Sequence, residues 1–413
     1  MTYTFKHTIR ASYLGYITQA IVVNLSPLLF VMFNSQFHIS LEQIGLLISI
    51  NFGVQIITDL VAARYINRFD TFRIPVLLAH VFAALGLVLL GVLPFVMPPH
   101  LGIVIATAFM AIGGGLIEVI ISPLVESCPG DEKAAAMSLL HSFYSWGQVG
   151  VVLLSTLYFA AFGQNNWHLL PILWALVPAF NVFLFNKVPL SSIVPEGGHV
   201  TSLRKLFSVR IFWILLALMI GAGASELAMS QWASLFAEAG LGVSKTLGDL
   251  LGPCAFAVLM GCARVFYGIK GSKINLNNFM VLSALMCLGS YALTVFSPSP
   301  ILSLVGCALC GLAVGIMWPG TISLAAKNYP EGGAAMFAVL ALAGDLGCST
   351  GPAIVGILSN NVISGKLSAI TSLFHDVNIT ESGLKVGLMA AMVFPMLIIW
   401  GVMALKAEGR KLK

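Results

Sequence analysis

The sequence predicts an all-α polytopic membrane protein with twelve transmembrane helices in two pseudo-symmetric six-helix bundles. Its 413 residues are 58% hydrophobic and 9% charged, whereas soluble domains carry about 25% charged residues. Twelve apolar segments each approach or exceed the roughly 20 residues that cross a bilayer as a helix. Backbone amides in hydrocarbon must be satisfied within the segment, so spans are helices or closed barrels, and alternating barrel strands are absent from the sequence.

The apolar segments follow one another with short polar breaks between them. The first is too long for a secretion signal and lacks a small-residue cleavage site, so we expect it to remain as the first helix. In the first half, breaks such as "RYINRFDTF" and "SCPGDEK" separate the spans; in the second half, "GIKGSK" and "NYPEGG" do so. The expected spans are 11–37, 41–63, 74–97, 100–126, 134–162, 167–187, 211–238, 245–268, 277–297, 300–326, 333–360 and 385–405.

An internal repeat divides the chain. The long hydrophilic stretch "KVPLSSIVPEGGHVTSLRKLFSVR" predicts an N-terminal bundle over 1–187, a cytoplasmic linker over 188–210 and a C-terminal bundle over 211–413. At an offset of about 200 residues, "AARYINRFDTFRI" answers "CARVFYGIKGSKI", and "ESCPGDEKAAAM" answers "KNYPEGGAAM". Gly147 and Gly347 fall in the same register. Repetition at matching points indicates duplicated bundles.

Lysine and arginine placement predicts the orientation. Eighteen of these residues fall on the side of the N-terminus, and Lys245, Lys366 and Lys385 fall on the other. This positive-inside bias places both termini in the cytoplasm of a multi-pass protein of the cell membrane. The net charge of +5 follows from that topology, so we expect the lipid bilayer and a small solute as partners and no nucleic acid.

The loop between the second and third spans carries Ala63, Asn67, Arg68, Asp70 and Arg73. Together with the topology and the repeat, this loop resembles the G-x-x-x-D-R-x-G-R-R loop of the major facilitator superfamily. Both glycines and the aspartate are replaced here, while the basic residues remain. The resemblance covers nearly the full chain and implies secondary transport by alternating access, with a cavity lined by the first, fourth, seventh and tenth helices.

Three further segments carry a narrower resemblance. They are "GGGLIEVIISPLVE" in the fourth span, "HSFYSWGQ" in the fifth and "GASELAMSQW" in the seventh. They are similar to segments of the fucose/galactose/glucose–proton symporter branch. That resemblance implies a sugar or polyol substrate, taken up together with protons.

Ionisable residues inside spans are the candidates for ion coupling. They are costly in a bilayer, and they usually face a cavity or a partner. Glu118 and His141 lie equally far from the turn between the fourth and fifth spans, so they can share a depth. In the alternative interpretation, Glu118 is a neutral acid that joins two helices through a hydrogen bond, and Asp345 belongs to a structural polar pair. The predicted proton-coupling residues are Glu118, His141, Glu226 and Asp345.

Neutral polar and aromatic side chains suit a polyhydroxylated solute, because amides and aromatic faces commonly hold sugars. Tryptophans in membrane proteins also mark interfaces or fill cores, which is the alternative interpretation. The predicted solute-binding residues are Asn24, Asn51, Gln55, Ser122, Trp146, Gln148, Gln231, Trp232 and Trp318. The expected cytoplasmic gate comprises Asp59, Arg64, Arg68, Arg73 and Arg264.

Several function classes are disfavoured. We expect no lysine or arginine at mid-depth of a span, which argues against an anionic substrate. Cys307 and Cys310 have CxxC spacing without nearby histidine, so we expect packing and neither a metal site nor a cofactor. HExxH and phosphate-loop motifs are absent from the sequence, so we expect a transporter and not an enzyme. We also expect it to be a monomer. The coupling ion is expected to be a proton, with Na⁺ as an alternative; a proton-coupled efflux antiporter for drugs or cations is the alternative function.

Overall fold

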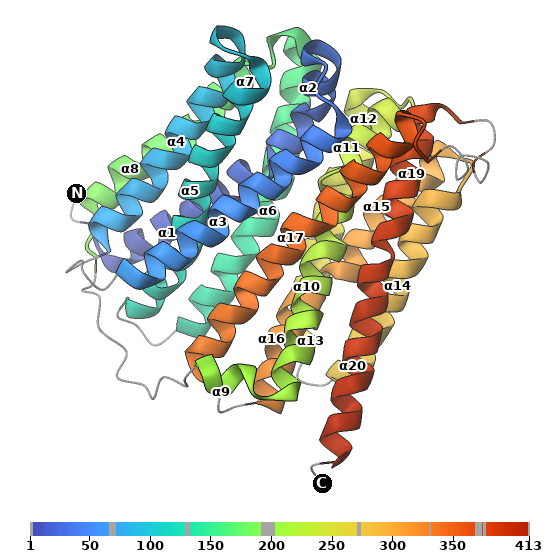
Figure 1. Ribbon diagram of the computed structural model, residues 1–413. Coiled ribbons are helices and arrows are strands. Elements are labelled where there is room, and N and C mark those ends of the chain that lie inside the picture. The colour runs from blue at the N-terminus through green and yellow to red at the C-terminus, as the bar shows by residue number, and fades with distance from the viewer. Residues whose placement is uncertain are drawn as a thin grey trace. The chain divides into compact units, whose positions relative to one another are not determined.

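The computed structural model describes residues 3–65, 72–128, 133–190, 203–270, 274–329, 332–367, 374 and 377–411. Of these, the side chains of 63–65, 126–127, 133–139, 141, 203, 333–335 and 409–411 are outside the description. All regular structure in the described residues is helical (Figure 1). Twelve segments of this part of the chain are long and apolar enough to cross a membrane, which confirms the predicted fold class.

Packing divides the chain into two compact units. Unit 1 comprises Met1–Ile39 and Ile50–Glu196, and unit 2 comprises Ser40–Ser49 and Gly197–Lys413. The helices up to the linker are α1 (Phe5–Asn24), η1 (Ser26–Leu29), α2 (Phe30–Phe37), α3 (Leu41–Tyr65), α4 (Arg73–Val96), α5 (Pro99–Ser127), α6 (Lys133–Phe162), η3 (Gln164–Asn166), α7 (Leu169–Trp174) and α8 (Leu176–Lys187). In unit 1, α4 packs along α5, and α1 packs against α5 and α6 (Figure 1).

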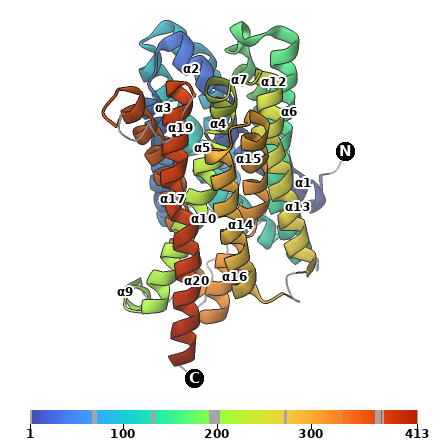
Figure 2. The same cartoon turned by 90° about the vertical axis from the view of Figure 1, so that its right-hand side faces the viewer.

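The second half repeats this helical organisation. Its helices are α9 (Leu203–Phe207), α10 (Arg210–Ser230), α11 (Ala233–Leu235), η4 (Phe236–Gly240), α12 (Lys245–Asp249), η5 (Leu250–Cys254), α13 (Ala255–Lys270), α14 (Leu276–Phe296), α15 (Pro300–Val314), α16 (Met317–Asn328), α17 (Gly333–Ile363), α19 (Ile379–Ala391) and α20 (Val393–Lys411). The short helices η4 and η5 are π-helical. Within unit 2, α10 packs along α17, and α14 packs against α15 and α20 (Figure 2).

Prolines interrupt four segments that the sequence analysis treated as single helices. Pro27, Pro178, Pro319 and Pro395 each lack an N–H group, so the carbonyl four residues earlier loses its helical donor. The preceding helices α1, α7, α15 and α19 each end within one residue of that carbonyl. In contrast, α17 continues through Pro352. Each of these four spans therefore contains more than one helix.

The two ends of the described spans also differ from the prediction. The first membrane-length segment begins at Phe5 and the last begins at Ile379, whereas the sequence analysis started them at residues 11 and 385. Polar residues such as His7 and Glu381 lower the hydropathy there, yet both lie in helical turns. Asn378 explains the second start, because its side chain accepts from Glu381 N at 2.8 Å and caps α19.

Matching glycines show the repeat at atomic detail. A Cβ atom at Gly147 would lie 2.9 Å from the Cβ of Ala20, so α6 lies close against α1. A Cβ atom at Gly347 would collide with the Ile220 carbonyl oxygen and lie 2.9 Å from Ala224 N, so α17 lies close against α10. Ala20 and Ile220 are separated by the same 200 residues as the two glycines.

We predict that Gly347→Ala destabilises the protein, because overpacking a helix contact costs about 1–3 kcal/mol. Gly289→Ala is the matched control, since a Cβ atom there meets nothing within 4 Å and alanine is the better helix former. Thermal unfolding of the purified protein in detergent measures both. Equal midpoints for the two variants would contradict the close contact between α10 and α17.

Candidate functional site

Three consecutive glycines of α5 allow three neighbouring helices to pack closely against it. A Cβ atom at Gly113 would lie 2.6 Å from Ala83 N on α4, and one at Gly115 would lie 2.7 Å from Asp59 Oδ1 on α3. Gly114 faces side chains from α1 and α3. Successive residues of an α-helix point about 100° apart. Each glycine therefore serves a different neighbour, and the polar side chains of α1 and α3 come close to α5.

One turn later, Glu118 meets two of these side chains. Its Oε2 accepts a hydrogen bond of 2.6 Å from Gln55 Nε2 and a longer one of 3.4 Å from Gln19 Nε2. Gln19 and Gln55 are only 6% and 2% exposed, while Glu118 is half-buried. The sequence analysis predicted roles for Glu118 and Gln55 but missed Gln19. Its amide inside the apolar stretch "YITQAIVV" was the available signal.

Asp59 adds a second acid to this group, which we call the α5 acid cluster: Gln19, Gln55, Asp59 and Glu118. Asp59 is 8% exposed, and its Oδ1 has no hydrogen-bond partner among the described residues. The Oε1 atoms of Gln19 and Gln55 likewise accept no hydrogen bond from that part of the chain. The cluster thus has more acceptor atoms than donors.

The predicted gate partners of Asp59 fall outside this geometry. Arg68 lies outside the described residues, and so does the side chain of Arg64. Arg73 is described, and its side chain contacts the end of α8. Its guanidinium group donates to the carbonyl oxygens of Phe185, Asn186 and Val188 at 2.7–3.0 Å, so it caps the C-terminus of α8, where positive charge is favourable.

Two further hydrogen bonds link α1 to its neighbours. Tyr16 OH and Ser122 Oγ are 2.8 Å apart, so Ser122 lies on the same face of α5 as Glu118. Asn24 Nδ2 donates to Ala20 O at 3.0 Å and lies 3.5 Å from Tyr144 OH. The two predicted solute-binding residues Ser122 and Asn24 therefore take part in hydrogen bonds that join α1 to α5 and to α6.

The remaining predicted residues of unit 1 differ in exposure. Asn51 and Gln148 are buried, whereas Trp146 is 47% exposed on α6. The side chain of His141 is outside the described part of the structure. Its predicted pairing with Glu118 stays a prediction.

A buried histidine that the sequence analysis did not single out has a structural role. His80 Nδ1 lies 2.8 Å from Val76 O, and Asn181 Nδ2 lies 2.8 Å from His80 Nε2 and 3.0 Å from Ala11 O. An amide nitrogen only donates, so His80 Nε2 accepts and Nδ1 carries the proton. This network joins α1, α4 and α8 inside unit 1.

In unit 2, Glu226 has a cationic neighbour. Arg264 Nη2 lies 3.5 Å from Glu226 Oε2, and Arg264 Nε donates to Gly315 O at 3.3 Å. Gly315 O is the carbonyl that loses its helical donor to Pro319. The sequence analysis assigned Glu226 and Arg264 to separate roles, and the structure brings them together.

Two lysines near the starts of membrane-length segments are buried in ion pairs. Lys245 Nζ lies 3.0 Å from both carboxylate oxygens of Asp249 and 2.8 Å from Ser234 Oγ. Its side chain is 6% exposed. From the sequence, Lys245 is expected at the external end of the eighth span; its burial was not predicted, because sequence does not reveal that α11 and α12 pack together.

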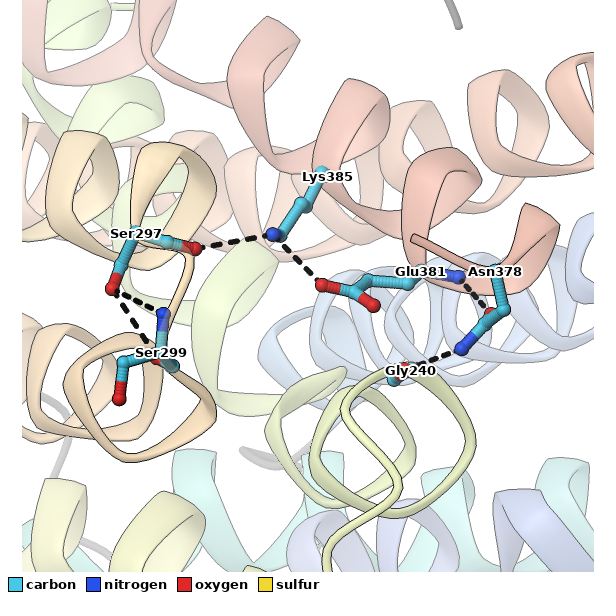
Figure 3. Close-up of polar contacts among 6 residues, drawn as sticks. All are labelled: Gly240, Ser297, Ser299, Asn378, Glu381 and Lys385. Atoms are coloured by element: carbon cyan, nitrogen blue, oxygen red, sulfur yellow. Dashed lines mark hydrogen bonds and ion pairs between the residues drawn. The ribbon is translucent and has the colours of Figure 1, made fainter. Parts of the chain in front are cut away.

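Lys385 forms the second buried ion pair (Figure 3). Its Nζ lies 2.8 Å from Glu381 Oε1 and 3.3 Å from Ser297 O, which joins α19 to the end of α14. Beside it, Asn378 Nδ2 donates to Gly240 O at 2.8 Å. These contacts order the start of α19.

The other predicted residues of unit 2 are mostly buried. Asp345 and Gln231 are buried, on α17 and at the end of α10. Trp232 is fully buried and donates through Nε1 to Pro352 O at 3.0 Å. Trp318 packs on Gly344, where a Cβ atom would lie 2.9 Å from its Cζ2. Trp232 therefore fills the core of unit 2.

An apolar groove lies on unit 1. Its volume is about 470 Å³, and its lining from α3, α4 and α5 is largely apolar, with Ile57, Leu78 and Leu116 among its residues. Ile57 and Leu78 are exposed. Such a lining offers almost no hydrogen bonds to a polar solute. Among the described residues, no three His, Cys, Asp or Glu side chains gather as metal ligands.

Comparison with known proteins identifies the family. The model of the Major Facilitator Superfamily matches residues 12–352. The chain belongs to the major facilitator superfamily. No curated protein sequence matches it. As a member of this superfamily with twelve membrane-length helices, it is a multi-pass membrane transporter.

Solved structures share the major facilitator fold at low identity. A bacterial homologue of the human lysosomal transporter Spinster, inward-facing and occupied, has 14% identity and a TM-score of 0.77 over 97% of each chain. A D-xylose–proton symporter has 14% identity and a TM-score of 0.75, over 94% of this chain and 97% of that one. A mutant of the nucleoside transporter NupG has 11% identity and a TM-score of 0.75, over 97% and 98%.

We predict that the Glu226–Arg264 pair is energetically coupled. Arg264→Ala leaves a buried acid without its cationic neighbour, which is more costly than losing both partners. In a double-mutant cycle with Glu226→Gln, the expected coupling is about 1 kcal/mol or more. Thermal or chemical unfolding in detergent measures the free energy of unfolding of the wild type, the two single variants and the double variant. Strict additivity would show that the two side chains act independently.

Proposed function

We propose that this transporter moves a small neutral polar solute, a sugar or polyol, across the cytoplasmic membrane by proton-coupled symport with alternating access. The observation that carries the proposal is the α5 acid cluster, in which a carboxyl group inside a membrane-length helix is met by two amides. Charged groups at such positions in membrane proteins usually mark ion pathways.

The partners of Glu118 suit a group that changes its protonation state. An amide donates through nitrogen to a carboxylate and accepts through oxygen from a carboxylic acid, so it can serve both forms. Gln55 and Gln19 offer both functions to Glu118. Glu226 differs, because Arg264 places a permanent charge beside it. We therefore propose that Glu118 carries the coupling proton and that Glu226 contributes to solute binding or to the stability of unit 2.

Neutral polar and aromatic side chains of unit 1 suit a solute rich in hydroxyl groups. Tyr16, Ser122 and Asn24 offer neutral donors and acceptors, and Trp146 is partly exposed as a flat apolar face. Two structural neighbours are named as transporters of a pentose and of nucleosides, which are polyhydroxylated solutes. The lysine and arginine distribution supports cytoplasmic termini. We expect the protein to act as a monomer.

The second candidate function is proton-coupled efflux of lipophilic cations. The apolar groove of unit 1 favours it, because such a surface suits an amphiphilic compound better than a sugar. The acids Asp59 and Glu118 would balance a positive charge.

Ligand-induced stabilisation separates the two substrate classes. A solute that binds the folded state raises the unfolding midpoint, and the rise grows with the logarithm of its concentration above the dissociation constant. We expect sugars or polyols to raise the midpoint of the purified protein, and lipophilic cations to leave it unchanged. A panel of sugars, polyols, nucleosides and cationic drugs measures this. Stabilisation by cationic drugs alone would support the efflux function instead.

We predict that Glu118→Gln abolishes accumulation driven by a pH gradient in proteoliposomes and leaves counterflow exchange intact. The amide keeps the shape of the side chain but cannot load or release a proton. Glu408→Gln is the matched control, because its carboxylate pairs with the highly exposed Arg210 at 3.0 Å on the surface. Retained accumulation in Glu118→Gln, measured with the solute from the stabilisation screen, would refute the coupling role.

A further inference from the structure

We propose that the α5 acid cluster is also a binding site for Na⁺, formed by oxygen atoms of Gln19, Gln55, Asp59 and Glu118. The proposal shares Glu118 with the proposed proton coupling but does not depend on the identity of the solute. The proposal rests on the number of buried acceptor oxygens in the cluster that lack a donor. One proton cannot provide a hydrogen bond to all of them.

The orientations of the amides establish this excess. When Glu118 is ionised, Gln55 Nε2 points to its Oε2 at 2.6 Å, because a carboxylate oxygen needs a donor opposite it. Its Oε1 is then left facing away from Glu118, buried and without a donor among the described residues. Gln19 has the same arrangement. Buried polar atoms are almost always satisfied, so these oxygens require a partner.

The unmatched oxygens are directed to the surface of α5 at its glycines. The Cβ position of Gly114 lies 3.1 Å from Gln19 Oε1 and 3.5 Å from Gln55 Oε1. The Cβ position of Gly115 lies 2.7 Å from Asp59 Oδ1. The oxygens of three side chains from two helices are thus grouped against adjacent positions of α5, one turn from Glu118. A proton supplies one hydrogen bond, whereas a metal cation can be shared by all of them.

The composition of the site favours a small monovalent ion. Amide and carboxylate oxygens are ligands for hard cations. Ca²⁺ takes six to eight oxygens and Mg²⁺ retains several waters, while the cluster offers few side-chain oxygens in a closely packed space. Two acids can balance one cation and retain the capacity to bind a proton. We therefore assign Na⁺ to the site.

Protons are expected to compete with Na⁺ through the titratable groups around the site. These are Asp59 on α3, Glu118 on α5 and Tyr16 on α1, whose hydroxyl contacts Ser122. On α4, both ring nitrogens of His80 are already hydrogen-bonded, to Val76 O and to Asn181 Nδ2. The side chain of His141 on α6 is outside the described residues. Acidification should therefore weaken Na⁺ binding.

Unfolding of the full-length protein in detergent without solute tests the site. NaCl replaces choline chloride at constant ionic strength and alkaline pH, with KCl as a parallel series. We expect the unfolding midpoint to rise with the logarithm of the Na⁺ concentration above its dissociation constant, a rise that K⁺ does not reproduce. Asp59→Asn and Gln19→Leu should each need at least about tenfold more Na⁺ for the same rise in midpoint, while Glu408→Gln, whose carboxylate pairs with Arg210, should keep the wild-type response.

Two results would overturn the Na⁺ site. One is an equal response to Na⁺, K⁺ and choline in the wild type, which would assign the cluster to protons or water alone. The other is an unchanged Na⁺ response in Asp59→Asn and Gln19→Leu. If a variant does not fold, equilibrium binding of radioactive Na⁺ to the wild type, with and without excess K⁺, decides. Uptake driven by a pH gradient in sodium-free buffer tests the proposed symport separately, so either proposal can fail alone.

Discussion

A carboxyl group among membrane helices must find its hydrogen-bond donors on other side chains, because the backbone donors around it are used within the helices. In unit 1 this requirement is met at Glu118 by two amides from α1 and α3. The amides reach it because α5 carries glycines where those helices approach. The close packing of α1, α3 and α5 and the hydrogen bonding of the acid therefore both depend on the glycines of α5.

The repeat makes the contrast between the units informative. Both use a glycine to bring the first helix of the unit against a later one, α1 against α6 and α10 against α17. Their acids are satisfied differently. Glu118 contacts neutral amides, whereas Glu226 lies beside Arg264, which also satisfies the carbonyl freed by Pro319. The two acids do not occupy equivalent positions of the repeat, and Glu118 is the one whose amide partners tolerate both charge states.

The sequence predicts the twelve spans well, because apolar length is a local property that a helix in lipid must have. It predicts that Glu118 and Gln55 are polar positions of interest, but not that they touch. Helix rotation and register decide such contacts, and Gln19 has no local signal that distinguishes it from a helix-lining amide. The burial of Lys245 and Lys385, which the sequence places at the external ends of two spans, escapes prediction for the same reason, since only tertiary packing buries them beside Asp249 and Glu381.

The central claim is that Glu118 binds the proton that accompanies the solute. Adding solute to purified protein in weakly buffered detergent solution, with a pH-sensitive dye, measures the protons taken up on binding. The account predicts an uptake approaching one proton per bound solute under alkaline conditions, lost in Glu118→Gln while solute still binds. Undiminished proton uptake in that variant would contradict it.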